Sequence, residues 1–169
     1  MLPKTPKVFN LFLDGDSWAG KVSEVTLPKL TRKTEDYRGG GMAAPVEIDL
    51  GYEKLEFEFT LQEYTADIIK KWGECSADGV PMRLLAGAKR DGGDCAVDNI
   101  EIIVRGRPRE LDFGNMKPGD LSGLKVPFAC SYFKYVLNGE TLVELDPVNM
   151  VEKIGGVDRY EKLREAIGV

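Results

Sequence analysis

The chain has 169 residues, a mass of 18.7 kDa and a net charge of −5, with 43% hydrophobic and 30% charged residues. These values are typical of one globular domain, here over residues 1–169, and the pI of about 5.0 argues against a DNA reader, which normally carries a basic surface. No run of residues approaches the ~18 apolar positions of a membrane-spanning helix, and the N-terminal segment lacks the apolar core of a signal peptide.

The first part of the chain has β character. Residues 8–13 form a mainly apolar run that ends at Asp14-Gly15, a strong hairpin signal. Residues 21–27 resume the β pattern, and Pro28 ends it because proline cannot donate a hydrogen bond to a strand ladder. We therefore expect a strand, a turn and a second strand in this part.

Residues 29–45, with the sequence KLTRKTEDYRGGGMAAP, are polar and charged and include three consecutive glycines. A connection of this length is unusual in a compact domain, and such loops are commonly functional or mobile. Two interpretations stay open at this point: a mobile surface loop, or an arm that becomes ordered against a partner.

Residues 52–61 alternate between apolar and polar side chains, which predicts a half-buried strand. The apolar face would consist of Leu55, Phe57, Phe59 and Leu61. The opposite face would be wet and acidic, as is common in antiparallel sheets, and would carry Lys54, Glu56, Glu58 and Thr60.

A short surface helix is predicted over residues 65–73, because its apolar positions have helical spacing and Gly73 suits a C-terminal end. We expect this helix to cover a sheet. Strands are predicted at residues 81–88 and 96–107, with a turn at residues 91–94 between them.

Residues 124–137 carry the longest strand signal, and both of their alternating faces are apolar. A strand of this kind is usually covered on both faces. Asn138-Gly139 then predicts a type I′ hairpin turn that leads into a strand over residues 140–145.

Residues 158–167 predict a C-terminal helix, in which Asp158 and Glu161 have the spacing of a capping box. An apolar stripe on this helix, which we expect to pack against the chain's own sheet, consists of Tyr160, Leu163 and Ile167. Together the elements predict a mainly β domain: a β-sandwich or partly closed β-barrel of antiparallel strands, with one or two short helices.

The residues with catalytic or metal-binding potential form no recognisable site. The absence of histidine excludes Ser-His-Asp and Cys-His catalysis within one chain. Residues 15–21 fit G-x-x-x-x-G-K, but Val22 stands where a phosphate loop needs Ser or Thr. Cys75, Cys95 and Cys130 match no metal-binding spacing, and we expect reduced, mostly buried thiols. We therefore expect no catalytic residue, cofactor or metal, and a protein that is not an enzyme.

Arg105, Arg107 and Arg109 alternate along the chain, so on an extended segment they would project to one side. Such a row could bind phosphates or carboxylates. The acidic residues Glu110 and Asp112 follow at once, which favours a solvated or subunit-bridging strip of ion pairs over nucleic-acid binding.

Several blocks of the sequence resemble the major tail tube proteins of contractile-tailed bacteriophages and R-type pyocin-like tailocins. They extend over nearly the whole chain, and residues 63–94 are the weakest match. The blocks are NLFLDG (10–15), VTLPKLTRKTEDYRGGGM (25–42), APVEIDLG (44–51), VRGRPRELDFG (104–114) and SYFKYVLNGETLVELDPVNMVEKIGGVDR (131–159), with LREAIGV at the C-terminus.

The resemblance implies a tail-tube-like fold and a structural role without catalysis or a small-molecule substrate. Such proteins form homohexameric rings, which stack into a hollow inner tube. The implied partners are further copies, the tail sheath protein, the baseplate and the tape-measure protein. DNA would pass through the lumen without specific binding, or the emptied tube of a tailocin would pierce the target envelope. The implied location is a virion tail or tailocin particle, assembled in the cytoplasm of the bacterial host.

Three groups of residues receive roles on this basis. Acidity and alternation suit a wall that repels DNA phosphates, so we expect Lys54, Glu56 and Glu58 to face the lumen. We expect the arm to become ordered only when rings stack, with contacts from Lys29, Arg32, Lys33, Glu35, Tyr37 and Arg38. Intersubunit or sheath-facing ion pairs are expected from Arg105, Arg107 and Arg109.

Two alternatives stay open. A tube component of a type VI-like secretion system would share the same architecture. A small-molecule-binding β-barrel would instead require a monomer with a closed apolar cavity.

Overall fold

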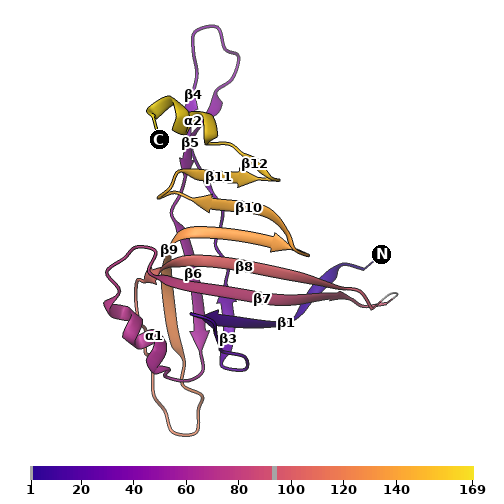
Figure 1. The fold of residues 1–169 in the computed structure, drawn as a ribbon, viewed down its shortest axis with the longest axis vertical. Helices are drawn as coiled ribbons and strands as arrows, with labels where there is room; N and C mark the ends of the chain where they lie inside the picture. Colours follow the sequence, from indigo (N-terminus) through magenta and orange to yellow (C-terminus); the bar gives the residue numbers. More distant parts are fainter. Residues whose placement is uncertain (1, 93–94) are drawn as a thin grey trace.

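The computed structural model describes residues 2–92 and 95–169, and its strands pair antiparallel (Figure 1). The predicted mainly β fold with two short helices is confirmed. Eight strands form a broad sheet, in the order β12 (Val157–Asp158), β11 (Val151–Ile154), β10 (Glu140–Asp146), β9 (Leu124–Leu137), β8 (Val97–Pro108), β7 (Val80–Arg90), β1 (Lys4–Leu13) and β2 (Asp16–Ser17).

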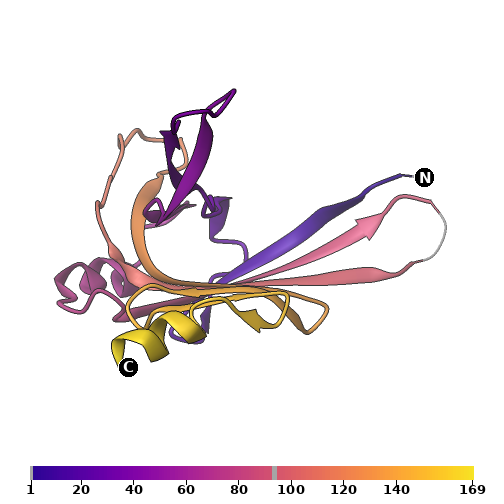
Figure 2. The same ribbon diagram turned by 90° about the horizontal axis from the view of Figure 1, so that it is seen from above.

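A second layer consists of β3 (Val22–Thr26) and β6 (Leu55–Leu61), and β9 belongs to both layers. One edge of β9 pairs first with β6, over residues 124–130, and then with β10, over residues 133–137. The other edge pairs with β8. Figure 2 shows the consequence: β9 bends strongly, and two groups of strands diverge from it. Within the described residues the strand order ends at β12 and β2, so the sheet stays open.

The core lies between the two layers and is rich in aromatic and aliphatic side chains. The alternation predicted for β6 is confirmed, because its four apolar residues are buried and the residues between them are not. Phe57 and Phe128 meet edge to face, with ring centroids 6.2 Å apart, a geometry that aromatic pairs prefer. The largest fully buried side chains are those of Phe57, Phe59, Phe128, Leu11, Leu61, Ile68, Met82, Ile102 and Leu124.

A bulge at Ser131 changes which side chains of β9 face the core. The register of β9 against β8 shifts by one residue here, so the alternation is reset. Val126 and Phe128 pack into the core before the bulge, and Phe133 and Tyr135 pack into it afterwards. The two faces predicted for this strand therefore contribute to the core in turn, before and after the bulge, and Val136 is buried on the other face as well.

The predicted surface helix is present as α1 (Ala66–Lys70), continued by the 3-10 turn η1 (Lys71–Gly73). Ile68 anchors it to the core and is fully buried. Of the turn predicted at residues 91–94, positions 93 and 94 lie outside the described residues.

The C-terminal helix α2 (Glu161–Ile167) is shorter than predicted, because residues 157 and 158 belong to β12. Asp158 is not the N-cap; its carboxylate accepts a hydrogen bond from the Tyr160 backbone N–H and pairs with Arg164. The expectation that the apolar stripe packs on the chain's own sheet is wrong, since Leu163 is 56% exposed and Ile167 63%.

Residues 29–45 are not a plain loop. They contribute β4 (Arg32–Tyr37), which pairs with β5 (Val46–Tyr52) in a separate two-stranded sheet. This hairpin, called the arm below, projects from the body in both views (Figures 1 and 2). The strand predicted from residue 52 accordingly starts at Leu55, after a break that separates it from the arm.

Gly106 lies where β8 approaches β9 most closely. A Cβ atom at this position would be 1.9 Å from the carbonyl oxygen of Ala129, so one strand would have to move. We expect Gly106→Ala to lower the free energy of unfolding by ~1–3 kcal/mol, the usual cost of overpacking. Gly123→Ala is the control, because the nearest atom to its Cβ would be 3.8 Å away. Thermal unfolding measures both, and equal melting temperatures would contradict this account.

Candidate functional site

The described residues contain no cluster of three side chains suited to hold a metal ion. No helix among residues 2–92 and 95–169 is long and apolar enough to cross a membrane. The charged side chains instead form ion pairs over the surface. These pairs decide which of the predicted contact residues keep a charge for a neighbouring molecule.

The residues expected to face a lumen lie on one outer face of the second layer. Glu56 accepts from Lys54, with an Nζ–Oε1 distance of 2.9 Å, and from Arg109. These bonds lower the pKa of Glu56 below its usual value. Glu58 lies 3.3 Å from the ammonium of Lys125. The predicted shared face is thus present, but cations balance its acidic residues locally.

The three alternating arginines reach three different elements. The Arg105 guanidinium lies 4.0 Å from the Tyr132 ring centroid and 3.8 Å from an Asp146 oxygen, whereas Arg109 pairs with Glu56. Arg107 donates to the Cys75 carbonyl oxygen at 3.4 Å and has no carboxylate partner within 4.0 Å among the described residues. Only Arg107 therefore keeps its charge available for a neighbouring molecule.

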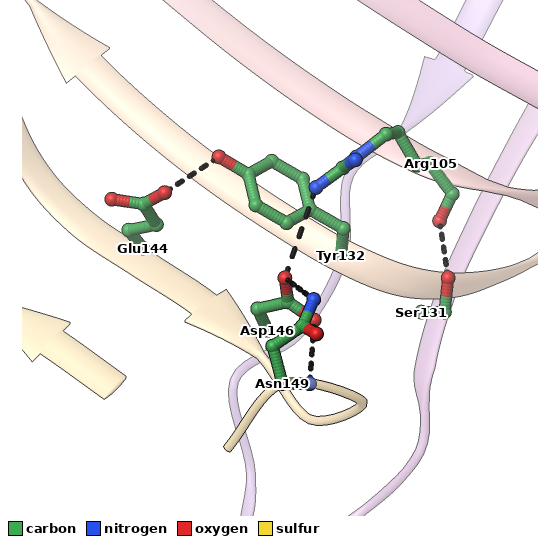
Figure 3. Close-up of polar contacts among 6 residues, drawn as sticks. All are labelled: Arg105, Ser131, Tyr132, Glu144, Asp146 and Asn149. Carbon is green, nitrogen blue, oxygen red and sulfur yellow. Dashed lines mark hydrogen bonds and ion pairs between the residues drawn. The ribbon is translucent and has the colours of Figure 1, made fainter. Parts of the chain in front are cut away.

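A polar network that the sequence reasoning missed holds the outer face of β8, β9 and β10 together (Figure 3). Tyr132 donates to Glu144 at 2.8 Å. Burial, with Glu144 beside it, raises the pKa of Tyr132 to about 12. Asp146 is buried and accepts from the backbone and side chain of Asn149, which closes the turn after β10. The spacing Asp146-Pro-x-Asn149 is a turn signal that could have indicated this part of the network.

The base of the arm is fastened to the broad sheet. Tyr52 donates to the buried carboxylate of Glu152 at 2.6 Å, and burial with this contact raises the pKa of Tyr52 to about 12. Arg32 lies over the Tyr52 ring, 5.4 Å from its centroid, and pairs with Asp49. The pKa of Asp49 is lowered by the backbone N–H of Gly51 and by Arg32. Arg32 therefore positions the arm.

The other predicted arm residues are exposed on the arm or on the segment that leads into it. Arg38 donates to the Met42 carbonyl oxygen at 3.2 Å near the tip of the arm. The exposed set consists of Lys29, Lys33, Glu35, Tyr37 and Arg38.

A known protein family matches nearly the whole chain. The model of phage tail tube protein FII matches residues 3–168. The chain belongs to this family. The tail tube protein of Escherichia phage P2 is 40% identical over 99% of both chains. The major tail tube protein of Serratia phage KSP20 is 35% identical over 99% of this chain and 98% of its own.

Solved structures support the fold. The sheath/tube terminator of an extracellular contractile injection system, PVC, matches with a TM-score of 0.58 at 9% identity, over 81% of this chain and 97% of its own. The sheath-tube complex of the same system matches with a TM-score of 0.55 at 10% identity, over 76% and 86%. The family match favours the phage tail tube over the secretion-system tube and the small-molecule barrel.

The three thiols differ from the expectation of mostly buried cysteines. Cys75 and Cys95 are exposed, because they lie in connections rather than in strands. Cys130 is partly buried and lines a pocket of about 450 Å³ at the fork between β6 and β10. Burial raises the pKa of the Cys130 thiol to about 12, with Glu56 contributing.

Alkylation should therefore separate the cysteines. The thiolate is the reactive form, so at about pH 8 iodoacetamide should modify Cys75 and Cys95 rapidly and Cys130 only after unfolding. Mass spectrometry of the intact protein with time measures this. Raising the pH toward the pKa of Cys130 should accelerate its reaction, and equal rates for all three thiols at about pH 8 would contradict the assignment.

Proposed function

We propose that this chain is the repeating subunit of the inner tube of a contractile tail, and that it closes into homohexameric rings that stack. The observation that carries the proposal is family membership over residues 3–168, with 40% identity to a phage tail tube protein over the whole chain. The role is mechanical: the tube forms a conduit, and no chemical step is catalysed.

The structure supports self-assembly because one edge of its broad sheet is largely unpaired. In the described residues, β2 covers β1 only at Phe12 and Leu13, so most of the outer edge of β1 has no strand beside it. An open edge is a template for another strand, and a closed ring of copies removes it. The arm is a two-stranded hairpin, which is marginally stable alone and gains stability when a neighbour covers it.

The partners proposed are the tail sheath protein outside the tube, the baseplate at one end and the tape-measure protein within. DNA passes through the lumen of a virion tail without specific binding; in a tailocin the empty tube pierces the envelope. Assembly takes place in the cytoplasm of the bacterial host. The solved neighbours described as a sheath-tube complex and a sheath/tube terminator make a sheath partner the natural expectation.

Electron microscopy of the concentrated protein tests the function. We expect rings or hollow cylinders, with six-fold symmetry in end views. Since nucleation of a ring stack can limit assembly, the sample should also be offered purified baseplates. Protein that stays monomeric under both conditions would refute the proposal.

We propose that the face with Lys54, Glu56 and Glu58 lines the lumen. In a background with Cys75→Ser and Cys95→Ser, Glu58→Cys in assembled tubes should react with a small maleimide but not with a globular protein that carries maleimide. Asp67→Cys on α1 is the control for an outer position, because the resemblance implies a helix outside. Reaction of Glu58→Cys with the large reagent would place this face on the outer wall.

Arg107 is proposed to form an ion pair with a neighbouring subunit or with the sheath. Its intramolecular partner is only a carbonyl oxygen, so removing its charge costs the monomer little. We expect Arg107→Glu to reduce the yield of tubes while the melting temperature of the monomer stays unchanged. Lys162→Glu, an exposed position on α2, is the matched control. An unaltered tube yield for Arg107→Glu would exclude the subunit contact, and unaltered sheath binding as well would exclude the role altogether.

A further inference from the structure

A pocket of about 450 Å³ lies at the base of the arm, beside the fork between β6 and β10. Its walls come from parts of the chain that are far apart in sequence: the connection from β5 to β6, the middle of β9, the turn after β10, and the residue before α2. A concave site of this size with mostly apolar walls is typical of pockets that hold a small organic ligand. The apolar lining includes Tyr52, Leu55, Leu145, Met150 and Tyr160.

Contacts behind the pocket hold its wall in place. Asp146 accepts from the backbone and side chain of Asn149, at 3.2 and 2.7 Å, which closes the turn after β10 (Figure 3). Met150 follows with φ of +53°, a left-handed conformation that is uncommon for a residue with a side chain. Its carbonyl oxygen accepts from Arg164 at 2.7 Å, and Arg164 also pairs with Asp158. Strained residues of this kind persist only where their surroundings fix them, and they cluster at ligand sites.

Carboxylates outnumber cations in the lining of the pocket. Three carboxylates line it, from Glu53, Asp146 and Glu152, against the single ammonium of Lys54. Glu152 is only 7% exposed, and its neutral partner is the hydroxyl of Tyr52 at 2.6 Å. Within the described part of the chain, neither Glu53 nor Glu152 has a cationic nitrogen within 4.0 Å. A buried carboxylate without a cation is costly, so a positively charged ligand stabilises it.

The cations around the pocket are already engaged by other carboxylates. The Lys54 ammonium lies 2.9 Å from Glu56, outside the pocket, and the Lys54 side chain is 74% exposed. Arg105 lies 3.8 Å from Asp146 and balances the third lining carboxylate. Arg32, at the base of the arm, pairs with a carboxylate of the arm itself. Two lining carboxylates therefore remain available to a cationic ligand.

We propose that this pocket is a binding site for a small organic cation with an aromatic or aliphatic body. The body packs against Leu55, Leu145 and Met150, whose thioether suits an aromatic ring. The cationic group pairs with Glu152 and Glu53. The inference goes beyond the proposed function, because binding requires neither a ring nor a neighbouring copy and involves no chemical step.

An NMR titration of the isotope-labelled full chain tests the site. The probes are tryptamine, tryptophol and indole-3-propionate, which share an indole ring and end in an ammonium, a hydroxyl and a carboxylate. We expect saturable binding of tryptamine with a Kd in the millimolar range, which is reasonable for a ligand of this size. Tryptophol should bind more weakly, and indole-3-propionate about tenfold more weakly than tryptamine. The shifted amide signals should centre on Leu55, Ser131 and Val151, which line the pocket.

Charge-removing variants locate the cationic group. Glu152→Gln and Glu53→Gln keep the shape of the side chain, and each should weaken tryptamine binding about two- to tenfold while tryptophol binding stays unchanged. The melting temperature shows whether Glu152→Gln folds; Glu53 is exposed, so its variant tests the site independently. Glu47→Gln is the matched control, because Glu47 is exposed on the arm and does not line the pocket.

Three results would overturn the proposal. The first is a lack of saturable tryptamine binding up to about 10 mM, well beyond the expected range. The second is equal affinity for the three probes, which would remove the preference for a cation. The third is binding that Glu53→Gln and Glu152→Gln leave as strong as Glu47→Gln does. None of these results bears on the tube function, which electron microscopy tests separately.

Discussion

The structure depends on a single strand that is hydrogen-bonded into two layers. β9 pairs with β6 through its first half and with β10 through its second, along the same edge. Backbone groups buried in a sheet must be paired, so the switch of partner has to be completed within Ser131 and Tyr132. The two layers diverge at this point, and the core fills the angle between them.

The irregular positions of the sheet decide where side chains point. At Ser131 the alternation of β9 is reset, so Val126 and Phe133 enter one core although they are an odd number of residues apart. The register of the arm also shifts by one residue near Gly51. This shift has the opposite effect, because it leaves apolar side chains of the arm exposed. A one-residue insertion thus completes the core in one place and exposes an apolar stripe in another.

Many carboxylates of this protein are balanced by a neighbouring cation, which the net charge alone does not show. With a net charge of −5 per chain, a ring of six copies would be strongly negative as a whole. In the subunit, however, Lys54, Arg109 and Lys125 lie against Glu56 and Glu58. Among the described residues, the carboxylates without an ion pair include Asp36 and Glu47, which lie on one face of the arm. The proposed lumen face therefore carries no net negative charge of its own, and these residues do not by themselves repel nucleic acid.

The sequence by itself determined the regular parts of this protein. Its period of two identified β6 and its buried residues, the turn residues located the hairpin between β9 and β10, and the quoted blocks indicated the tail tube family. Only the tertiary structure decided which face each strand presents beyond a bulge and which charges meet. Alternation is a local property, whereas a register shift depends on the neighbouring strand, and Glu56 and Arg109 are 53 residues apart in the chain.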